Sequence, residues 1–243
     1  MIEKRNFYIN GSWVPPKNPK DIEVINPATE KNCAVISLGS KDDINDAVLA
    51  AKEAFKTWGF TSKEERLSLL EVFYSLYKKR WNDITDAIIQ EMGAPKDFAS
   101  KLQTGTGASH TKSFIRYLKE FEFEKPLGDH AKNQRIIYEP KGVCALITPW
   151  NWPINQVTLK VIPALASGCT MILKPSELAP LSAMIIAELI DEAKFPKGVF
   201  NLVNGDGEIT GDALTSHPDV NMISFTGSTR AGALISQNAA KDF

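Results

Sequence analysis

The sequence has few cysteines and histidines, three of each in 243 residues. The cysteines are odd in number and widely spaced, which excludes a disulfide framework and a zinc site with paired, closely spaced ligands. No two histidines have the spacing of metal ligands, so we predict no metal site and expect solvated or capping histidines. The cysteines lie in apolar, strand-like contexts, and we expect all three to be reduced and to pack as small buried side chains rather than act as nucleophiles. They are Cys33, Cys144 and Cys169.

The sequence also lacks a charge imbalance and long apolar runs. Its 28 basic and 29 acidic residues leave a formal charge of −1, with no block of like charges to attract phosphate backbones or anionic lipids. No segment reaches membrane-spanning length, and the N-terminus has no apolar signal region. We therefore expect no nucleic-acid or membrane partner and a cytoplasmic location. With 43% hydrophobic and 23% charged residues, the chain has the composition of an ordinary globular protein.

Residues 1–122 are expected to form an extended arm followed by helices. The first forty residues carry turn dipeptides such as Asn10-Gly11 between short β-prone runs. Apolar residues then recur at helical spacing, twice behind a capping pattern, Ser40 with Asp43 and Ser62 with Glu65. The spacing predicts four helices, over residues 40–58, 62–77, 84–92 and 99–118.

The remaining residues predict a hairpin and then a sheet. Alternating residues over 121–139 indicate a projecting β-hairpin, assigned to residues 123–143. Over residues 144–243, short apolar runs alternate with helical stretches, as in parallel strands that are buried on both faces. The predicted fold class is α/β: a Rossmann-like open parallel sheet with flanking helices, N-terminal helices and a projecting β-hairpin arm.

In open α/β sheets ligands bind beyond the carboxyl ends of the strands, so the residues after each apolar run are the candidate site. After the first run comes Pro149-Trp150-Asn151-Trp152-Pro153. The Asn151 amide could stabilise a developing oxyanion, or it could simply cap the helix that begins near Pro153.

After the second apolar run comes Lys174-Pro175-Ser176-Glu177. A lysine can hold a ribose hydroxyl or a phosphate, and a carboxylate can accept bonds from ribose while repelling a 2′-phosphate, which favours NAD over NADP. The alternative for Lys174 and Glu177 is a solvated pair of loop charges.

Two glycine-containing loops follow the last two runs. Asn204-Gly205-Asp206-Gly207 suits positive φ angles and close backbone approach, although such loops are usually plain turns. Thr226-Gly227-Ser228-Thr229-Arg230-Ala231-Gly232 joins a strand to a helix whose N-terminus could receive a pyrophosphate. It is neither the dinucleotide fingerprint nor a P-loop, so alone it is a weak signal.

Together these segments resemble the aldehyde dehydrogenase superfamily, in order along essentially the whole chain. The matching stretches are Asn26-Pro27-Ala28-Thr29, Glu91-Met92-Gly93-Ala94-Pro95, Ile147-Thr148-Pro149-Trp150-Asn151-Trp152-Pro153, Lys174-Pro175-Ser176-Glu177, Pro196-Lys197-Gly198-Val199-Phe200-Asn201 and Phe225-Thr226-Gly227-Ser228.

The resemblance implies NAD(P)-dependent oxidation of an aldehyde to a carboxylic acid, with NAD as the expected cofactor and NADP less favoured. It implies that the Asn151 amide holds the oxyanion, that Lys174 and Glu177 hold the adenine-side ribose, and that the full-length protein is a homo-oligomer. The cofactor-binding residues implied are Ile147, Thr148, Pro149, Trp150, Lys174, Ser176, Glu177, Gly207, Phe225, Thr226, Gly227, Ser228, Ala231 and Gly232.

In that family a cysteine attacks the aldehyde, and a glutamate in a Glu-Leu-Gly-Gly stretch activates water. That glutamate would follow soon after the region matching residues 239–243, and the cysteine further on, so both are expected to be missing, together with the catalytic domain. None of the three cysteines present matches the nucleophile. Three readings follow: an N-terminal part of an aldehyde dehydrogenase that is inactive alone, a non-catalytic NAD-binding or regulatory remnant, and an enzyme that works with only the residues present. We favour the first.

Overall fold

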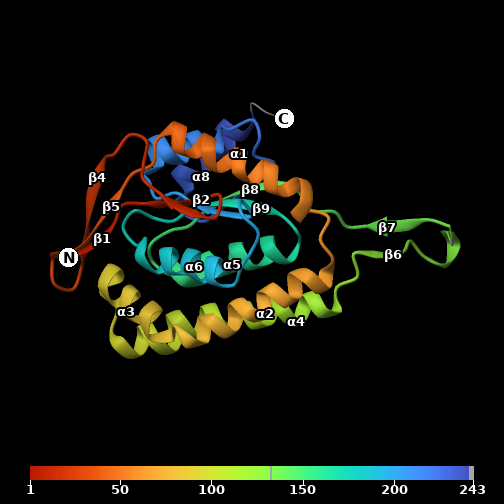
Figure 1. The fold of residues 1–243 in the computed structure, drawn as a ribbon, viewed down its shortest axis with the longest axis horizontal. Coiled ribbons are helices and arrows are strands. Elements are labelled where there is room, and N and C mark those ends of the chain that lie inside the picture. The colour runs from red at the N-terminus through yellow and green to blue at the C-terminus, as the bar shows by residue number, and fades with distance from the viewer. Residues whose placement is uncertain (132, 241–243) are drawn as a thin grey trace.

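A six-stranded mixed sheet forms the centre of the computed structural model, which describes residues 1–131 and 133–240 (Figure 1). Four neighbouring strands are parallel: β11 (Met222–Phe225), β8 (Val143–Ile147), β9 (Thr170–Lys174) and β10 (Phe200–Leu202). Two antiparallel strands, β2 (Phe7–Ile9) and β3 (Ser12–Val14), continue the sheet beyond β10. The predicted α/β class with parallel strands is confirmed, and the antiparallel edge is an addition that the sequence analysis did not anticipate.

Helical crossovers make the central strands parallel. The connecting segments are α5 (Pro153–Ala166), α6 (Leu181–Glu192), and a π-helical turn η3 (Gly207–Gly211) that runs into α7 (Asp212–Thr215); α8 (Thr229–Ala239) follows the last strand. Helices α5 and α6 cover one face of the sheet, and α1 (Lys41–Trp58), α7 and α8 lie over the other (Figure 1). Strands β8 and β9 are buried along their whole length, as their continuous apolar runs predicted.

The N-terminal helices lie within three residues of the predicted bounds, and the fourth is divided into a π-helical segment and an α-helix. They are α1, α2 (Lys63–Lys79), α3 (Trp81–Met92), the π-helical segment η1 (Phe98–Thr104) and α4 (Gly105–Glu120). Ser40 and Asp43 form a reciprocal capping box at α1, and the Ser62 side chain accepts a hydrogen bond from the Glu65 N–H at α2. Helix α3 ends at Gly93, whose φ of 65° is the left-handed conformation that glycine adopts readily.

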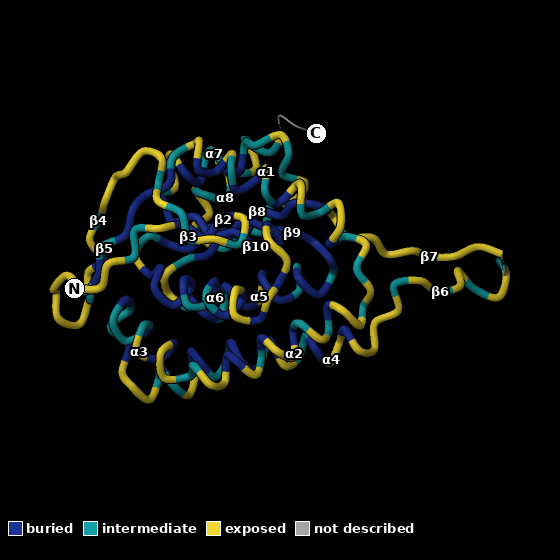
Figure 2. The backbone as a smooth tube through the Cα atoms, in the orientation of Figure 1, coloured by how far each residue is buried: buried dark blue, intermediate teal, exposed yellow. Residues whose placement is uncertain are grey.

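Helices α2, α3 and α4 form an outer layer on the far side of α5 and α6 (Figure 1). The larger apolar core lies on this side of the sheet and includes Tyr77, Ile154 and Met171. Figure 2 shows the buried residues concentrated in the central strands and in the inner faces of these helices. The molecule therefore has four layers, with the sheet second from one side.

The first forty residues form strands in two sheets, which differs from the expected extended arm. Besides β2 and β3, strands β1 (Ile2–Lys4), β4 (Asp21–Asn26) and β5 (Lys31–Ser37) make a separate sheet in the order β1-β5-β4. Phe7 and Ala34 are completely buried, which explains why these segments pack on the body instead of remaining free.

The predicted hairpin is present and projects from the body (Figure 1). Its antiparallel strands are β6 (Glu124–Pro126) and β7 (Arg135–Ile137), joined through a short 3₁₀ turn, η2 (Asp129–Ala131). Residues 241–243, at the end of the predicted 144–243 core, lie outside the described residues. Within the described ranges, no helix is long and apolar enough to cross a membrane, and no cluster of three potential metal-ligating side chains occurs.

Candidate cofactor site

The carboxyl ends of the central strands lie side by side at one edge of the sheet. Phe225 at the end of β11 is opposite Ile147 of β8, and Ile147 is opposite Lys174 of β9. Backbone bonds extend this alignment past the strands, because the Thr226 N–H donates to the Ile147 carbonyl at 3.2 Å and the Thr148 N–H donates to the Lys174 carbonyl at 3.2 Å. Three residues predicted to bind cofactor are thus neighbours in space.

A hollow of about 490 Å³ opens at this edge, which is within the size range of small-molecule sites. Six of the predicted cofactor-binding residues line it: Ile147, Lys174, Gly207, Phe225, Ser228 and Ala231. Seven other predicted residues come within three positions after the ends of β8, β9 and β11: Thr148, Pro149, Trp150, Ser176, Glu177, Thr226 and Gly227. The strand ends, the η3 turn and the N-terminus of α8 therefore build one concave site.

Lys174 is buried at the base of this hollow, with 4% of its surface exposed. Its Nζ donates to the carbonyl oxygens of Pro175, at 3.1 Å, and Gly205, and lies 3.7 Å from a carboxylate oxygen of Glu177. Burial lowers the pKa of the Lys174 ammonium, and the negative charges of Glu177 and Asp206 act in the opposite direction. The solvated charge pair considered from the sequence is therefore wrong for Lys174.

The N-terminus of α8 faces the same hollow. Ser228 is its N-cap and accepts a hydrogen bond from the Ala231 N–H at 3.2 Å. The N–H groups of Thr229 and Arg230 lie outside the helical hydrogen-bond ladder, and the helix dipole adds partial positive charge at this end. With the buried ammonium of Lys174 opposite, the site offers donors and positive charge that suit the pyrophosphate and ribose of a dinucleotide.

The loop after β10 differs from the sequence expectation in its backbone. Neither Gly205 nor Gly207 has a positive φ angle. A Cβ atom on Gly205 would collide with the Thr210 side chain, so close approach is what requires glycine there. A Cβ on Gly207 would meet nothing within 4 Å, which leaves that position open toward the hollow. Asp206 caps the η3 turn by accepting from the Ile209 N–H at 2.8 Å.

Asn151 is exposed in the loop after β8. The N-cap of α5 is Trp152, which makes no capping hydrogen bond through its side chain, so the capping role considered for Asn151 is wrong. Two contacts fix this loop to the η1 segment. Buried Gln103 donates from Nε2 to the Asn151 carbonyl at 3.3 Å, and the Trp152 ring packs edge-on against Phe98 with 5.4 Å between ring centroids. The Asn151 side-chain amide makes no hydrogen bond within the described residues, and its oxyanion role stays a prediction.

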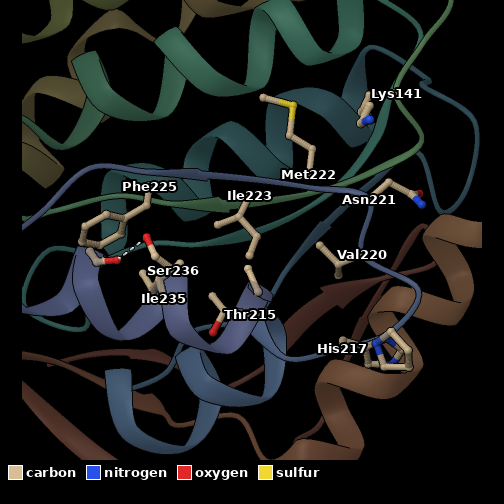
Figure 3. A pocket seen from close by; sticks show the side chains of 13 residues that line it. Lys141, Thr215, His217, Val220, Asn221, Met222, Ile223, Phe225, Ile235 and Ser236 are labelled. Carbon is tan, nitrogen blue, oxygen red and sulfur yellow. Dashed lines mark hydrogen bonds between the residues drawn. The ribbon is translucent and has the colours of Figure 1, made fainter. Parts of the chain in front are cut away.

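A second hollow, of about 630 Å³, follows the edge strand β11 (Figure 3). It lies between β11, α7, α8 and the loop at His217, and it shares Thr215, Phe225 and Ile235 with the first hollow. Phe225 and Gly232 are the two predicted cofactor-binding residues that line it. Although it is larger, the carboxyl ends of β8 and β9 do not contribute to it, so we assign the cofactor to the first hollow.

Several residues that line the first hollow were not predicted. The face of α8 that carries the predicted Ala231 also supplies Leu234, Ile235 and Asn238, at the i+3, i+4, i+7 spacing that could have identified them. The others are Glu208, Gly211, Asp212, Thr215 and Arg230. No sequence pattern identified these residues, which lie in the η3 turn, in α7 and at the start of α8.

The cysteines and histidines lie away from this site. All three cysteines are free thiols; Cys144 and Cys169 are buried as expected, and Cys33 is partly exposed. His110 is hydrogen-bonded to the Asn155 side chain at 2.7 Å, which pairs α4 with α5. The lining of the first hollow includes no cysteine or histidine.

Comparison with known proteins identifies the family. The aldehyde dehydrogenase family matches residues 13–243 of this chain. The chain belongs to that family. This aldehyde dehydrogenase chain is 51% identical to 3-succinoylsemialdehyde-pyridine dehydrogenase of a Pseudomonas species over 241 residues, which are 99% of the chain and 50% of the relative.

Solved aldehyde dehydrogenases share its fold. An aldehyde dehydrogenase from Bartonella henselae is 57% identical with a TM-score of 0.98, covering 100% of this chain and 51% of that one. A mutant aldehyde dehydrogenase C from Pseudomonas syringae, solved with NAD+ and octanal, is 47% identical with a TM-score of 0.95, covering 98% and 48%. The chain thus spans about half the length of these relatives and corresponds to their N-terminal part.

Proposed function

We propose that this chain is the NAD-binding part of an aldehyde dehydrogenase, and that NAD binds in the hollow at the carboxyl edge of the sheet. The observation that carries the proposal is the convergence of Lys174, Phe225 and the α8 N-terminus on that hollow. The Pseudomonas syringae relative and a betaine aldehyde dehydrogenase from Staphylococcus aureus were solved with NAD+, which supports this cofactor.

In this proposal the buried Lys174 ammonium and Glu177 hold the adenine-side ribose, and the N–H groups at the start of α8 hold the pyrophosphate. Glu177, with its side chain 35% exposed, would repel a 2′-phosphate and so favour NAD over NADP. Bound NAD supplies the hydride acceptor for oxidation of an aldehyde. Asn151 would donate from its amide to the aldehyde oxygen as negative charge develops there.

The nucleophilic cysteine and the general-base glutamate are proposed to lie outside these 243 residues. The cysteines present support this, because none lines the hollow and two are buried elsewhere. The chain alone is then expected to bind cofactor without oxidising aldehyde. The aldehyde substrate, a homo-oligomeric full-length enzyme and the cytoplasmic location remain predictions.

Titration of the chain with NAD+ and with NADP+, followed by calorimetry, tests the proposal. We expect NAD+ to bind more tightly, and Lys174→Ala to weaken its binding about tenfold, the effect of losing one charge-assisted hydrogen bond. Gly227→Val should weaken it as well, because a Cβ there would come within 2.5 Å of the Phe225 ring that lines the site. Lys56→Ala, on the exposed side of α1, is the matched control.

The assignment would be refuted if the folded chain bound neither dinucleotide. It would also be refuted if both site variants bound NAD+ as tightly as the unaltered chain. The absorbance of NADH, followed after the chain is mixed with NAD+ and an aldehyde, distinguishes a chain that only binds NAD from an enzyme that works with the residues present. Turnover by this chain alone would mean that its own residues supply the nucleophile.

A further inference from the structure

Two of the buried cysteines lie together on one face of the central sheet. Cys144 of β8 is opposite Met171 of β9, and Cys169 comes two residues before Met171, so the two thiols share a face. Cys144 is 3% and Cys169 is 4% exposed, and their side chains are in hydrogen-bond contact. Neither residue belongs to the cofactor site.

Hydrogen-bond donors converge on the Cys169 sulfur. The Ser167 hydroxyl donates to it at 3.5 Å, and the Cys144 thiol and the backbone N–H groups of Lys141 and Gly142 interact with it; the Cys144 thiol also donates to the Gly142 carbonyl, at 3.9 Å. The Cys144 hydrogen bond, with these other donors, lowers the pKa of the Cys169 thiol although burial opposes it, and the same contact raises the pKa of Cys144. These contacts favour ionisation of Cys169 over ionisation of Cys144.

A buried cation lies beside the pair. Arg66 of α2 is 5% exposed, and its Nε has no hydrogen-bond partner among the described residues. Its Nη1 lies against Gly168, the residue before Cys169, and its Cζ lies 4.7 Å from the centre of the Phe123 ring. Burial lowers the pKa of the Arg66 guanidinium, and the negative charges of Cys169, Glu64 and Glu65 act in the opposite direction. An arginine without a carboxylate at hydrogen-bond distance is suited to stabilise a neighbouring thiolate.

Arg66 also connects this cluster to the surface. It forms part of the wall of a hollow of about 560 Å³ at the base of the hairpin, together with Lys63, Phe123 and Pro126. Arg66 is therefore the residue that this hollow and the cysteine cluster share. Large alkylating reagents would be excluded, because both sulfurs belong to residues with almost no exposed surface.

We propose that Cys169, Cys144 and Arg66 form a peroxide-sensitive dithiol site, in which Cys169 is the reacting thiolate and Cys144 the resolving thiol. The Cys169 thiolate attacks one oxygen of hydrogen peroxide, the O–O bond breaks, and hydroxide leaves to be protonated to water. Cys169 is then a sulfenic acid. Cys144 attacks that sulfur, a disulfide forms, the S–O bond breaks, and the Cys144 proton leaves with the oxygen as a second water. Two thiols and one peroxide thus give one disulfide and two waters.

Cys33 provides an internal reference in the same chain. It is more exposed than the other two cysteines, its thiol donates to the Val24 carbonyl at 3.2 Å, and burial of its partly covered sulfur raises its pKa. If access alone set the rate, Cys33 would react first. We expect Cys169 to react before Cys33 instead, because its surroundings favour the thiolate.

The experiment treats the reduced 243-residue chain with hydrogen peroxide and maps the cysteine peptides by non-reducing mass spectrometry over time. We expect a Cys144–Cys169 cross-link that has lost two hydrogen atoms, formed while Cys33 is still a thiol and reversed by a dithiol reductant. Oxidation of Cys33 first, or the absence of that cross-link, would overturn the proposal without affecting the cofactor assignment.

Two variants separate the roles within the pair. Cys144→Ser should leave Cys169 to accumulate as the sulfinic acid, with two added oxygen atoms. Arg66→Met should slow cross-linking, because the Cys169 thiolate loses a neighbouring positive charge, whereas Arg116→Met, on the exposed side of α4, should not. Equal rates in the two arginine variants, both folded by circular dichroism, would remove Arg66 from the site.

Discussion

Glu91 is a buried carboxylate that joins two helices. It lies near the end of α3, is 3% exposed, and caps the N-terminus of α6 by accepting from the N–H groups of Leu181 and Ser182 and from the Ser182 hydroxyl. Burial raises the pKa of Glu91 to about 7 from its ordinary 4.5, although these hydrogen bonds act to lower it. The folded chain therefore holds a proton on this group that the unfolded chain releases.

This residue predicts a pH dependence of stability. Because the folded pKa is raised, the free energy of unfolding should fall as pH rises from about 4.5 through about 7, by about 3 kcal/mol for this group. Glu91→Gln keeps an oxygen acceptor and should flatten that part of the curve in urea unfolding. Glu64→Gln, at an exposed position of α2, is the control. Parallel curves for Glu91→Gln and the unaltered chain would contradict the prediction.

At the residue scale, the sequence pointed to candidate residues but did not predict which groups surround them in the fold. Lys174 follows an apolar run and was a sound candidate, but its burial depends on carbonyl groups from Pro175 and Gly205 that the fold brings to it. Gln103 gave no signal, and Glu91 appeared only within a family-matching stretch, because a buried polar residue on a helix looks the same in sequence as an exposed one.

At the scale of elements, the closest helix packing occurs where α4 crosses α5 and α2. A Cβ on Gly107 would collide with the side chains of Ile154 and Tyr77, and Tyr77 is fixed by donating from its hydroxyl to the Thr104 carbonyl at 2.9 Å. The packing of α4 against α2 and α5 thus requires a residue without a Cβ atom at position 107.

Gly107→Ala should lower the free energy of unfolding by about 1–3 kcal/mol through overpacking. Gly105→Ala is the matched control in the same helix, because its nearest contact would be 3.7 Å away, and it should raise stability by about 0.5–1 kcal/mol. Thermal and urea unfolding of the two variants measure this. Similar changes of the same sign would mean that α4 shifts to accept the methyl group.

Local signals predicted the regular elements well and the irregular ones poorly. Capping at Ser40 and Ser62 and the stop at Gly93 are short-range effects, so they can be read from adjacent residues. The π-helical segments η1 and η3 were not predicted, because their extra residue per turn is set by packing around Gln103 and Thr210 rather than by a sequence period.

For the whole molecule, the edge strand β11 is a poorly covered part of the sheet, with no fully buried residue. Met222 is 46% and Leu234 is 52% exposed, and no residue of α8 is fully buried within the described part of the chain. An edge strand with apolar neighbours favours pairing with another chain.

We therefore expect the isolated chain to associate as its concentration rises, as measured by sedimentation velocity. Met222→Lys places a charge on this edge and should raise the concentration needed for association about tenfold, or 1.4 kcal/mol. Phe60→Lys, which replaces an 85% exposed apolar residue elsewhere, should have no such effect. A chain that remains monomeric at all concentrations would contradict this expectation.

The alternation of apolar runs and helical stretches over residues 144–243 was enough to predict the parallel strands and the edge where ligands bind. It could not predict that β2 joins the same sheet. Phe7, Tyr8 and Ile9 form a run too short to show a period, and their partner strand β10 comes near the other end of the sequence.

That pairing has a consequence for how the chain is made. Asn10 donates from its backbone to the side chain of Asn201 at 2.9 Å, across a separation of 191 residues. At a synthesis rate of about 5–20 residues per second, roughly 10–40 s pass before the N-terminal strand can find its partner. During that time Phe7, completely buried in the finished fold, is exposed to the cell. One of the first strands to leave the ribosome, β2, is thus among the last to reach its place in the central sheet, and the nascent chain needs protection for that interval.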